Sequence, residues 1–362
     1  MSPGPITSSF STSWAALLED TRQEQRRNRS PLWRLVKGGT LLVTRVLHTR
    51  RRRRHHAVGL LMAGVTALAL LAYLPLSRAG ATDVKPSDTG VRVVKNITYL
   101  TDECPREGMQ VQRADAYLPS PPLQSAAPAV ILVHGGGFVS GVRNSEWFVN
   151  TGTYLASKGW AVFSIDYCMP PRGTAGFPVE VQNVQAALEF FTENASTYRV
   201  DPSRIAVWGA SAGATLATHA AALTGKGQAE VSVTAAVGWS GAYDFTDFTG
   251  SSPGNILTSL NYLGCDPRRT RTCMATAVDA SPASHVASTT PPMMLANSVD
   301  DPIPLNQLKV MAAALAKADV ESKTLVLPGD RHGLDYSSDA FCPTVAFLEK
   351  YLSPIPGTCT AP

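Results

Sequence analysis

Two hydrophobic patterns follow one another along most of the chain. Apolar and polar residues alternate over 91–100 and 109–118, which predicts an antiparallel pair of strands. Beyond residue 128 apolar residues come in short runs, and the run at 129–133 is continuous, as in a strand buried on both faces of a parallel sheet. The remaining runs predict strands over 160–166, 205–208, 231–239, 292–298 and 323–327, with helices over 145–158, 178–195 and 214–221. Strands that alternate with helices indicate a doubly wound, mostly parallel sheet, in which active sites gather at the carboxyl ends of strands.

A different pattern lies nearer the N-terminus, where residues 57–76 form a stretch of twenty residues without a charged side chain. Such a stretch is long enough to cross a bilayer, and the run Arg50–Arg54 before it is expected to stay in the cytoplasm. The pattern predicts one transmembrane helix that remains as a signal anchor, with everything after it outside the cytoplasm. Ala79-Gly80-Ala81 also matches a signal-peptidase site, so cleavage after Ala81, and secretion, stays an alternative.

These patterns divide the chain into five parts. Residues 1–56 are expected to form a basic, largely disordered cytoplasmic tail, followed by the membrane anchor at 57–76 and a polar linker at 77–89. Residues 90–352 are expected to form one globular domain, and 353–362 a short C-terminal tail.

Charge is distributed unevenly between the tail and the rest of the chain. The chain has 32 Lys and Arg and 28 Asp and Glu, a formal net charge of +4, but the first 56 residues hold twelve of the basic residues and three of the acidic ones. The remaining residues are therefore net negative by five. Nucleic-acid binding requires a basic face, so no nucleic-acid partner is expected. The oligomeric state stays unknown at this stage.

All six cysteines lie after the predicted membrane segment, and an even number in an oxidising compartment favours disulfides. Proximity in the sequence, and elimination for the last pair, favours these partners: Cys265 with Cys273, Cys342 with Cys359, and Cys104 with Cys168. No Cys-x-x-Cys pair or His/Cys cluster has the spacing of metal ligands. The sequence therefore predicts no metal site and no cofactor.

The candidate nucleophile is Ser211, at the centre of the G-x-S-x-G sequence from Gly209 to Gly213. It stands between the predicted strand 205–208 and the predicted helix 214–221, which is the context of a nucleophile elbow. A sharp turn from strand to helix pushes the serine hydroxyl outward, and glycine at the flanking positions lets the two backbones approach. The motif by itself is also compatible with a tight turn that has no chemical function.

Three consecutive glycines follow the predicted strand 129–133, in the sequence His134-Gly135-Gly136-Gly137-Phe138. Such a loop can turn its amide groups towards an anion. The spacing of phosphate-binding loops is missing, whereas H-G-G-G accompanies the G-x-S-x-G elbow as an oxyanion hole for acyl transfer. The two motifs together, each at the end of a predicted strand, favour nucleophilic catalysis over a plain turn at Ser211.

Two later strand ends supply a candidate acid and a candidate base. The predicted strand 292–298 is followed by Asp300 and Asp301, and the predicted strand 323–327 is followed by His332. Nucleophile, acid and histidine in this order match the arrangement of α/β-hydrolases. Spacing alone does not separate the two neighbouring carboxylates, so both remain candidates for the acid.

Residues 90–352 resemble an α/β-hydrolase of the hormone-sensitive-lipase and BD-FAE-like carboxylesterase group. The resemblance rests on these motifs: HGGGF at 134–138, WGASAGA at 208–214, SPASHV at 281–286, VDDPIP at 299–304 and RHG at 331–333. It implies an α/β-hydrolase fold and an oxyanion hole made by the amides of Gly136, Gly137 and Ala212.

The resemblance also implies a catalytic triad. In similar enzymes the acid stands four residues before the second proline of such a loop, which selects Asp300 over Asp301. The expected triad is therefore Ser211, Asp300 and His332. The segment 243–280 is expected to form a small lid, and its lack of a long apolar helix favours short-chain acyl substrates.

The sequence therefore predicts a serine carboxylesterase that is anchored in the cell membrane and hydrolyses small-molecule esters outside the cytoplasm, through an acyl-enzyme on Ser211. Two other functions stay open. One is a serine peptidase of the prolyl-oligopeptidase type. The other is a hydrolase-fold binding protein without activity, for which a lost serine or histidine would be expected, although neither is lost here.

Overall fold

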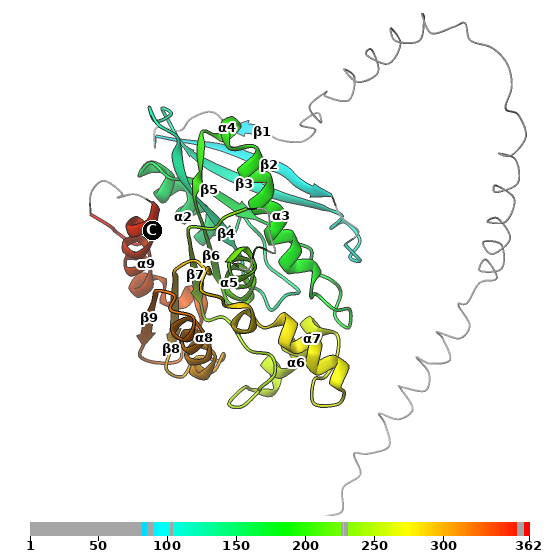
Figure 1. The fold of residues 1–362 in the computed structure, drawn as a ribbon. Helices are drawn as coiled ribbons and strands as arrows, with labels where there is room; N and C mark the ends of the chain where they lie inside the picture. Colours follow the sequence, from blue (N-terminus) through cyan, green and yellow to red (C-terminus); the bar gives the residue numbers. More distant parts are fainter. Residues whose placement is uncertain (1–81, 85–89, 102–103, 226, 228–230, 353–357) are drawn as a thin grey trace, which may run out of the picture. The chain divides into compact units, whose positions relative to one another are not determined.

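The computed structural model describes residues 82–84, 90–101, 104–225, 227, 231–352 and 358–362 (Figure 1). The predicted cytoplasmic tail 1–56 and the predicted membrane segment 57–76 lie outside these residues. Within the described ranges, no helix is both long enough and apolar enough to cross a membrane.

In the described part of the chain nine strands form one sheet, in the order β1-β2-β3-β5-β4-β6-β7-β8-β9 (Figure 1). The strands are β1 (Thr82–Val84), β2 (Val91–Thr101), β3 (Val111–Pro119), β4 (Ala127–Val133), β5 (Ala161–Ile165), β6 (Val200–Ala210), β7 (Ala235–Trp239), β8 (Met293–Ser298) and β9 (Ser322–Leu327). The pairs β1–β2, β2–β3 and β3–β5 are antiparallel. The pairs β5–β4, β4–β6, β6–β7, β7–β8 and β8–β9 are parallel. The predicted mostly parallel sheet and its antiparallel N-terminal pair are therefore confirmed.

Helices cover both faces of this sheet (Figure 1). One face carries α2 (Glu146–Ser157) and α9 (Ser337–Leu352), and the other carries α3 (Val179–Glu193), α5 (Ala212–Gly225) and α8 (Leu305–Lys317). The shorter elements are α4 (Ala195–Tyr198), α6 (Pro253–Leu263), α7 (Arg271–Ala280), and the 3₁₀ helices η2 (Pro282–His285) and η3 (Gly333–Tyr336).

The central strand β4 shows why both faces need cover. All seven of its residues are buried. Ile131 and Val133 belong to the core beneath α3, α5 and α8, whereas Val130 and Leu132 belong to the core beneath α2 and α9. Successive strand residues point to opposite faces, so a continuous apolar run exposes apolar surface on both unless helices cover each one.

The N-terminal edge of the sheet differs from the prediction. Residues 82–84 were expected within the polar linker 77–89, but they form strand β1, which pairs antiparallel with residues 93–95 of β2. Backbone amides and carbonyls pair whatever the side chains are. A short polar segment beside an open strand edge can therefore extend the sheet without an apolar signal.

Three disulfides link the cysteines in the three expected pairs: Cys104–Cys168, Cys265–Cys273 and Cys342–Cys359. The last of them ties the expected C-terminal tail to α9. The amide of Thr360 also donates to the Tyr154 hydroxyl oxygen at 3.1 Å. The described end of the chain is thus held against α2 and α9.

The predicted lid segment 243–280 contains α6 and α7, drawn in yellow in Figure 1. Ser252 caps α6, because its hydroxyl accepts the amide of Asn255, and Gly264 ends the helix at φ +70°. Thr270 caps α7 in the same way. The insertion is therefore helical, with start and stop residues of its own.

Candidate active site

Ser211 occupies a sharp turn between β6 and α5 with a left-handed backbone, at φ +56°. A Cβ at Gly209 would lie 2.1 Å from the Gly213 carbonyl oxygen, and a Cβ at Gly213 would lie 2.2 Å from the Val133 carbonyl oxygen. Only glycine fits at either position, because both obstacles are backbone atoms that cannot move aside. The G-x-S-x-G sequence therefore forms a strained elbow at the carboxyl end of the sheet.

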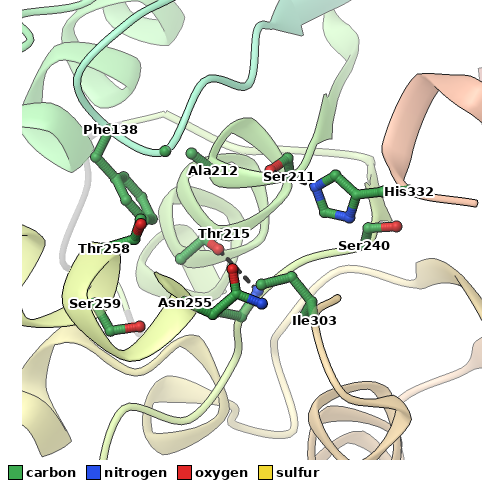
Figure 2. Close-up of a pocket in the computed structure, with 12 residues that line it drawn as sticks. Phe138, Ser211, Ala212, Thr215, Ser240, Asn255, Thr258, Ser259, Ile303 and His332 are labelled. Carbon is green, nitrogen blue, oxygen red and sulfur yellow. Dashed lines mark hydrogen bonds between the residues drawn. The ribbon is translucent and has the colours of Figure 1, made fainter. Parts of the chain in front are cut away.

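His332 lies in the loop between β9 and η3, directly beside this elbow (Figure 2). Its Nε2 is 2.8 Å from Ser211 Oγ, and its Nδ1 is 2.7 Å from Asp301 Oδ1. An ionised carboxylate can only accept a hydrogen bond, so the neutral ring carries its hydrogen on Nδ1 and leaves Nε2 free to accept the serine hydroxyl. Serine, imidazole and carboxylate are thus joined in a series.

The carboxylate in this series belongs to Asp301, so the choice of Asp300 over Asp301 was wrong. The amide of Asp300 donates to the Gly329 carbonyl at 2.9 Å, which holds residues 299 and 300 in a turn at the surface. The Asp300 side chain is exposed there, whereas Asp301 is 6% exposed and points back to His332. The first two residues after β8, Val299 and Asp300, form the turn. Asp301 is therefore the carboxylate that faces the edge of the sheet.

The glycine loop after β4 lies close to Ser211, since a Cβ at Gly135 would be 3.0 Å from Ser211 Cβ. Its backbone is left-handed at both Gly136 (φ +125°) and Gly137 (φ +60°). Three amides are expected in an oxyanion hole. Gly137 and Ala212 line the cavity at Ser211. Gly136 directly precedes Gly137 and turns the chain there. Ala212 is also the first residue of α5, and the first amides of a helix have no partner within it. Residues of the glycine loop and of α5 therefore line the cavity together.

His134 begins this loop and has a structural role. The side chain is 2% exposed, and its Nδ1 donates to the Gly135 carbonyl at 2.8 Å. Burial lowers the pKa of His134, which keeps the imidazole neutral. The ring stacks on Tyr167, whose hydroxyl donates to the His134 carbonyl at 3.0 Å. These contacts fix the start of the glycine loop and leave the histidine without access to the cavity.

A cavity of about 100 Å³ lies in front of Ser211 and His332 (Figure 2). Its lining includes Phe138 and Ile303 on the apolar side, and Asn255, Thr258 and Ser259 from one face of α6. Asn255 also donates to the Pro302 carbonyl, which joins the lid to the loop that carries Asp301. The sequence predicts a lid but gives no sign of which of its side chains reach the cavity, since no motif surrounds them.

The BD-FAE family model matches residues 114–315, more than half of the chain. The probable carboxylic ester hydrolase LipM of Mycobacterium tuberculosis is 28% identical over 246 residues, which are 65% of this chain and 56% of LipM. The esterase LipQ of the same organism is 30% identical over 224 residues, 59% of this chain and 51% of LipQ. The match therefore spans about half the length of these curated relatives.

Solved esterase structures share the fold. A truncated carbohydrate esterase from gut microbiota superposes with a TM-score of 0.61 at 20% identity, over 74% of this chain and 99% of the other. A bacterial heroin esterase superposes with a TM-score of 0.56 at 24% identity, over 80% of this chain and 89% of the other. At these identities the likeness establishes the α/β-hydrolase fold.

Proposed function

The chain belongs to the BD-FAE family of α/β-hydrolases, and we propose that it is a serine carboxylesterase that cleaves short-chain acyl esters. The observation that carries the proposal is the hydrogen-bonded series from Ser211 through His332 to Asp301, with separations of 2.8 and 2.7 Å. The series opens on a cavity whose lining includes Gly137 and Ala212, the residues expected to supply backbone donors. Nucleophile, base and orienting acid in this geometry are the parts that acyl transfer needs.

In the first half of the reaction Ser211 Oγ attacks the ester carbonyl carbon, and His332 Nε2 takes the hydroxyl proton. The imidazolium that forms is stabilised by Asp301, which accepts the Nδ1 hydrogen. The carbonyl oxygen becomes an oxyanion and accepts hydrogen bonds from the amides of Gly137 and Ala212. Collapse of this intermediate breaks the ester bond. His332 returns its proton to the leaving alcohol, and the acyl group stays on Ser211.

In the second half a water molecule takes the place of the alcohol. His332 Nε2 removes a proton from this water, whose oxygen attacks the acyl carbonyl carbon. The second oxyanion uses the same two amides. When it collapses, the bond to Ser211 Oγ breaks, the serine regains its proton from His332, and the carboxylic acid leaves.

The size of the cavity supports a short acyl group. Ligand pockets are typically about 300–1,000 Å³, so a cavity of about 100 Å³ favours a small acyl group. Phe138 closes it on one side, and the ring of Phe138 stacks on Tyr262 of α6 at a centroid distance of 4.0 Å. A long acyl chain would have to displace this aromatic pair or lie along the lid surface.

The proposal includes a location outside the cytoplasm, with residues 57–76 as a membrane anchor. It is supported by the uncharged stretch next to Arg50–Arg54 in the sequence and by the three disulfides, which persist in oxidising compartments. Protease treatment of intact cells tests the location. We expect the domain to be degraded from outside and the N-terminal tail to stay protected; a fully protected chain would contradict the location.

The activity is tested with the full chain and its Ser211→Ala variant on p-nitrophenyl acetate, butyrate and decanoate. We expect hydrolysis by the wild type alone, fastest on acetate or butyrate, and labelling of Ser211 by a fluorophosphonate. Ester hydrolysis that persists in Ser211→Ala would refute the serine mechanism. Cleavage of peptide substrates in preference to esters would favour a peptidase instead. No hydrolysis and no labelling would favour a binding protein.

A further inference from the structure

A second buried serine, Ser240, is hydrogen-bonded to the acid of the site. Ser240 Oγ donates to Asp301 Oδ2 at 2.5 Å, while Asp301 Oδ1 accepts the Nδ1 hydrogen of His332. Ser240 is 0% exposed, and Asp301 is 6% exposed. The carboxylate is thus held between the catalytic imidazole on one oxygen and a serine hydroxyl on the other.

Ser240 and Ser211 occupy matching positions on neighbouring strands. β6 ends at Ala210 and β7 ends at Trp239, and these two residues pair in the parallel register. Each is followed by a serine with left-handed backbone, at φ +56° for Ser211 and φ +54° for Ser240. Such a backbone is unfavourable for a residue other than glycine and persists only where surrounding contacts hold it. Both serines are therefore fixed at the catalytic edge of the sheet.

The direction of the hydrogen bonds at Ser240 follows from its neighbours. Besides Asp301, Ser240 Oγ lies 2.8 Å from the Gly333 amide and 2.7 Å from the Tyr336 hydroxyl oxygen. An amide N–H only donates and an ionised carboxylate only accepts, so the single hydrogen of Ser240 points to Asp301. Burial raises the pKa of Tyr336 above its ordinary range, so Tyr336 keeps its one hydrogen. That hydrogen has two acceptors within reach, Ser240 Oγ at 2.7 Å and the Ala296 carbonyl oxygen at 3.1 Å.

These bonds give the Asp301 carboxylate a donor at each oxygen. Oδ1 accepts from His332 and from the amide of Ile303, the latter at 2.7 Å, and Oδ2 accepts from Ser240. Without the Ser240 hydroxyl, Oδ2 would be a buried carboxylate oxygen that has lost its donor, and only the bonds at Oδ1 would orient the carboxylate. Ser240 also accepts from Gly333, which directly follows His332 in the chain.

We propose that Ser240 is a positioning residue for acyl transfer, which fixes the Asp301 carboxylate and the His332 loop in the orientation that activates Ser211. The inference rests on the proposed esterase function. Ser240 does not act as a second nucleophile, because its hydrogen is directed to Asp301, its oxygen accepts from the Gly333 amide, and the Tyr336 hydroxyl lies 2.7 Å away.

The kinetic test compares Ser240→Ala with Ser164→Ala in the full chain. Ser164 on β5 is also 0% exposed, and its hydroxyl donates one hydrogen bond, to the Arg143 carbonyl at 2.6 Å. Both variants therefore remove one buried hydroxyl. We expect Ser240→Ala to lower kcat for p-nitrophenyl acetate by roughly tenfold or more with KM changed less than about twofold, because the lost interaction acts after substrate binding. Ser164→Ala is expected to keep kcat within about twofold.

A second readout does not depend on turnover. The proton shared by His332 Nδ1 and Asp301 is followed by NMR at low field, where its resonance is assigned by its absence from a His332→Ala variant. We expect this resonance to move or broaden in Ser240→Ala and to stay in place in Ser164→Ala. An active wild type whose Ser240→Ala variant keeps wild-type kcat and an unchanged resonance would overturn the proposal. If the wild type hydrolyses no ester, the proposed function fails, and the resonance alone decides whether Ser240 positions the pair.

Discussion

The Asp301 carboxylate lies 2.7 Å from His332 Nδ1, while the carboxylate of its neighbour Asp300 faces solvent. Two adjacent residues of the same type thus have different surroundings. The turn at 299–300 is held by backbone bonds from Val299 to Leu327 and from Asp300 to Gly329, at 2.9 Å each. This pairing sets which carboxylate points inward, and it makes the two residues a matched pair for mutation.

Asp301→Asn is predicted to lower kcat by roughly 10⁴-fold, the effect of the same change in serine proteases. The asparagine amide can donate to His332 Nδ1, and the ring would then carry its hydrogen on Nε2, where it cannot accept from Ser211. Steady-state hydrolysis of p-nitrophenyl acetate measures the change. Asp300→Asn alters the same charge one residue away and should keep kcat within about twofold; a larger loss in Asp300→Asn than in Asp301→Asn would contradict the assignment.

Much of the fold could be predicted because its central strands, such as β4 and β8, are buried on both faces. The apolar run at 129–133 matches β4, and the runs at 292–298 and 323–327 match β8 and β9 to within one residue at each end. Ser211 directly follows β6 and His332 lies in the loop after β9, so the motifs and the strand pattern pointed to the same edge of the sheet. The local sequence therefore predicts the tertiary position of residues that directly follow a recognisable strand.

The rest depends on contacts between segments that are far apart in the sequence. The choice of Asp301 depends on backbone pairing with the loop after β9, about 30 residues further on, which the spacing of the VDDPIP motif does not contain. Ser240 follows the predicted strand 231–239, so its strand-end position was the one signal for it. Tyr336 carries no such signal, because it reaches Ser240 from a short 3₁₀ helix.

Gly213→Ala is predicted to destabilise the domain and to inactivate it. The new Cβ would lie 2.2 Å from the Val133 carbonyl oxygen and 2.6 Å from that of His134, so the elbow would have to move away from the glycine loop. Overpacking of this kind costs about 1–3 kcal/mol or more, and the shift would separate Ser211 from the Gly137 amide. Thermal unfolding followed by circular dichroism, together with kcat, measures both effects.

Gly254→Ala is the control for this substitution. Gly254 lies in the first turn of α6, and the nearest atom to a Cβ there is Ser252 Oγ at 3.9 Å. Replacing a helical glycine by alanine without a clash stabilises by about 0.4–1 kcal/mol. The two variants should therefore shift the unfolding temperature in opposite directions. A Gly213→Ala protein with wild-type stability and kcat would show that the elbow tolerates a side chain.

Glu180→Gln is predicted to change how stability depends on pH. Glu180 on α3 is 0% exposed, and neither carboxyl oxygen has a hydrogen-bond partner. Burial raises its pKa well above the ordinary value of 4.5. The folded chain therefore keeps a proton that the unfolded chain releases above about pH 4.5, so wild-type stability falls as pH rises from there towards the folded-state pKa. Glutamine is neutral at every pH and lacks this loss.

The measurement is the unfolding temperature of wild type and Glu180→Gln between pH 4 and pH 8. The difference between the two should grow in favour of the variant by at least about 2 °C across this range, the shift that about 1 kcal/mol produces in a domain of this size. Burying the glutamine amide changes the unfolding temperature by the same amount at every pH. Such a constant offset does not affect how the difference between the two proteins varies with pH. Glu193→Gln, at the exposed end of the same helix, should run parallel to wild type. Parallel curves for Glu180→Gln as well would mean that Glu180 keeps its ordinary pKa in the folded chain.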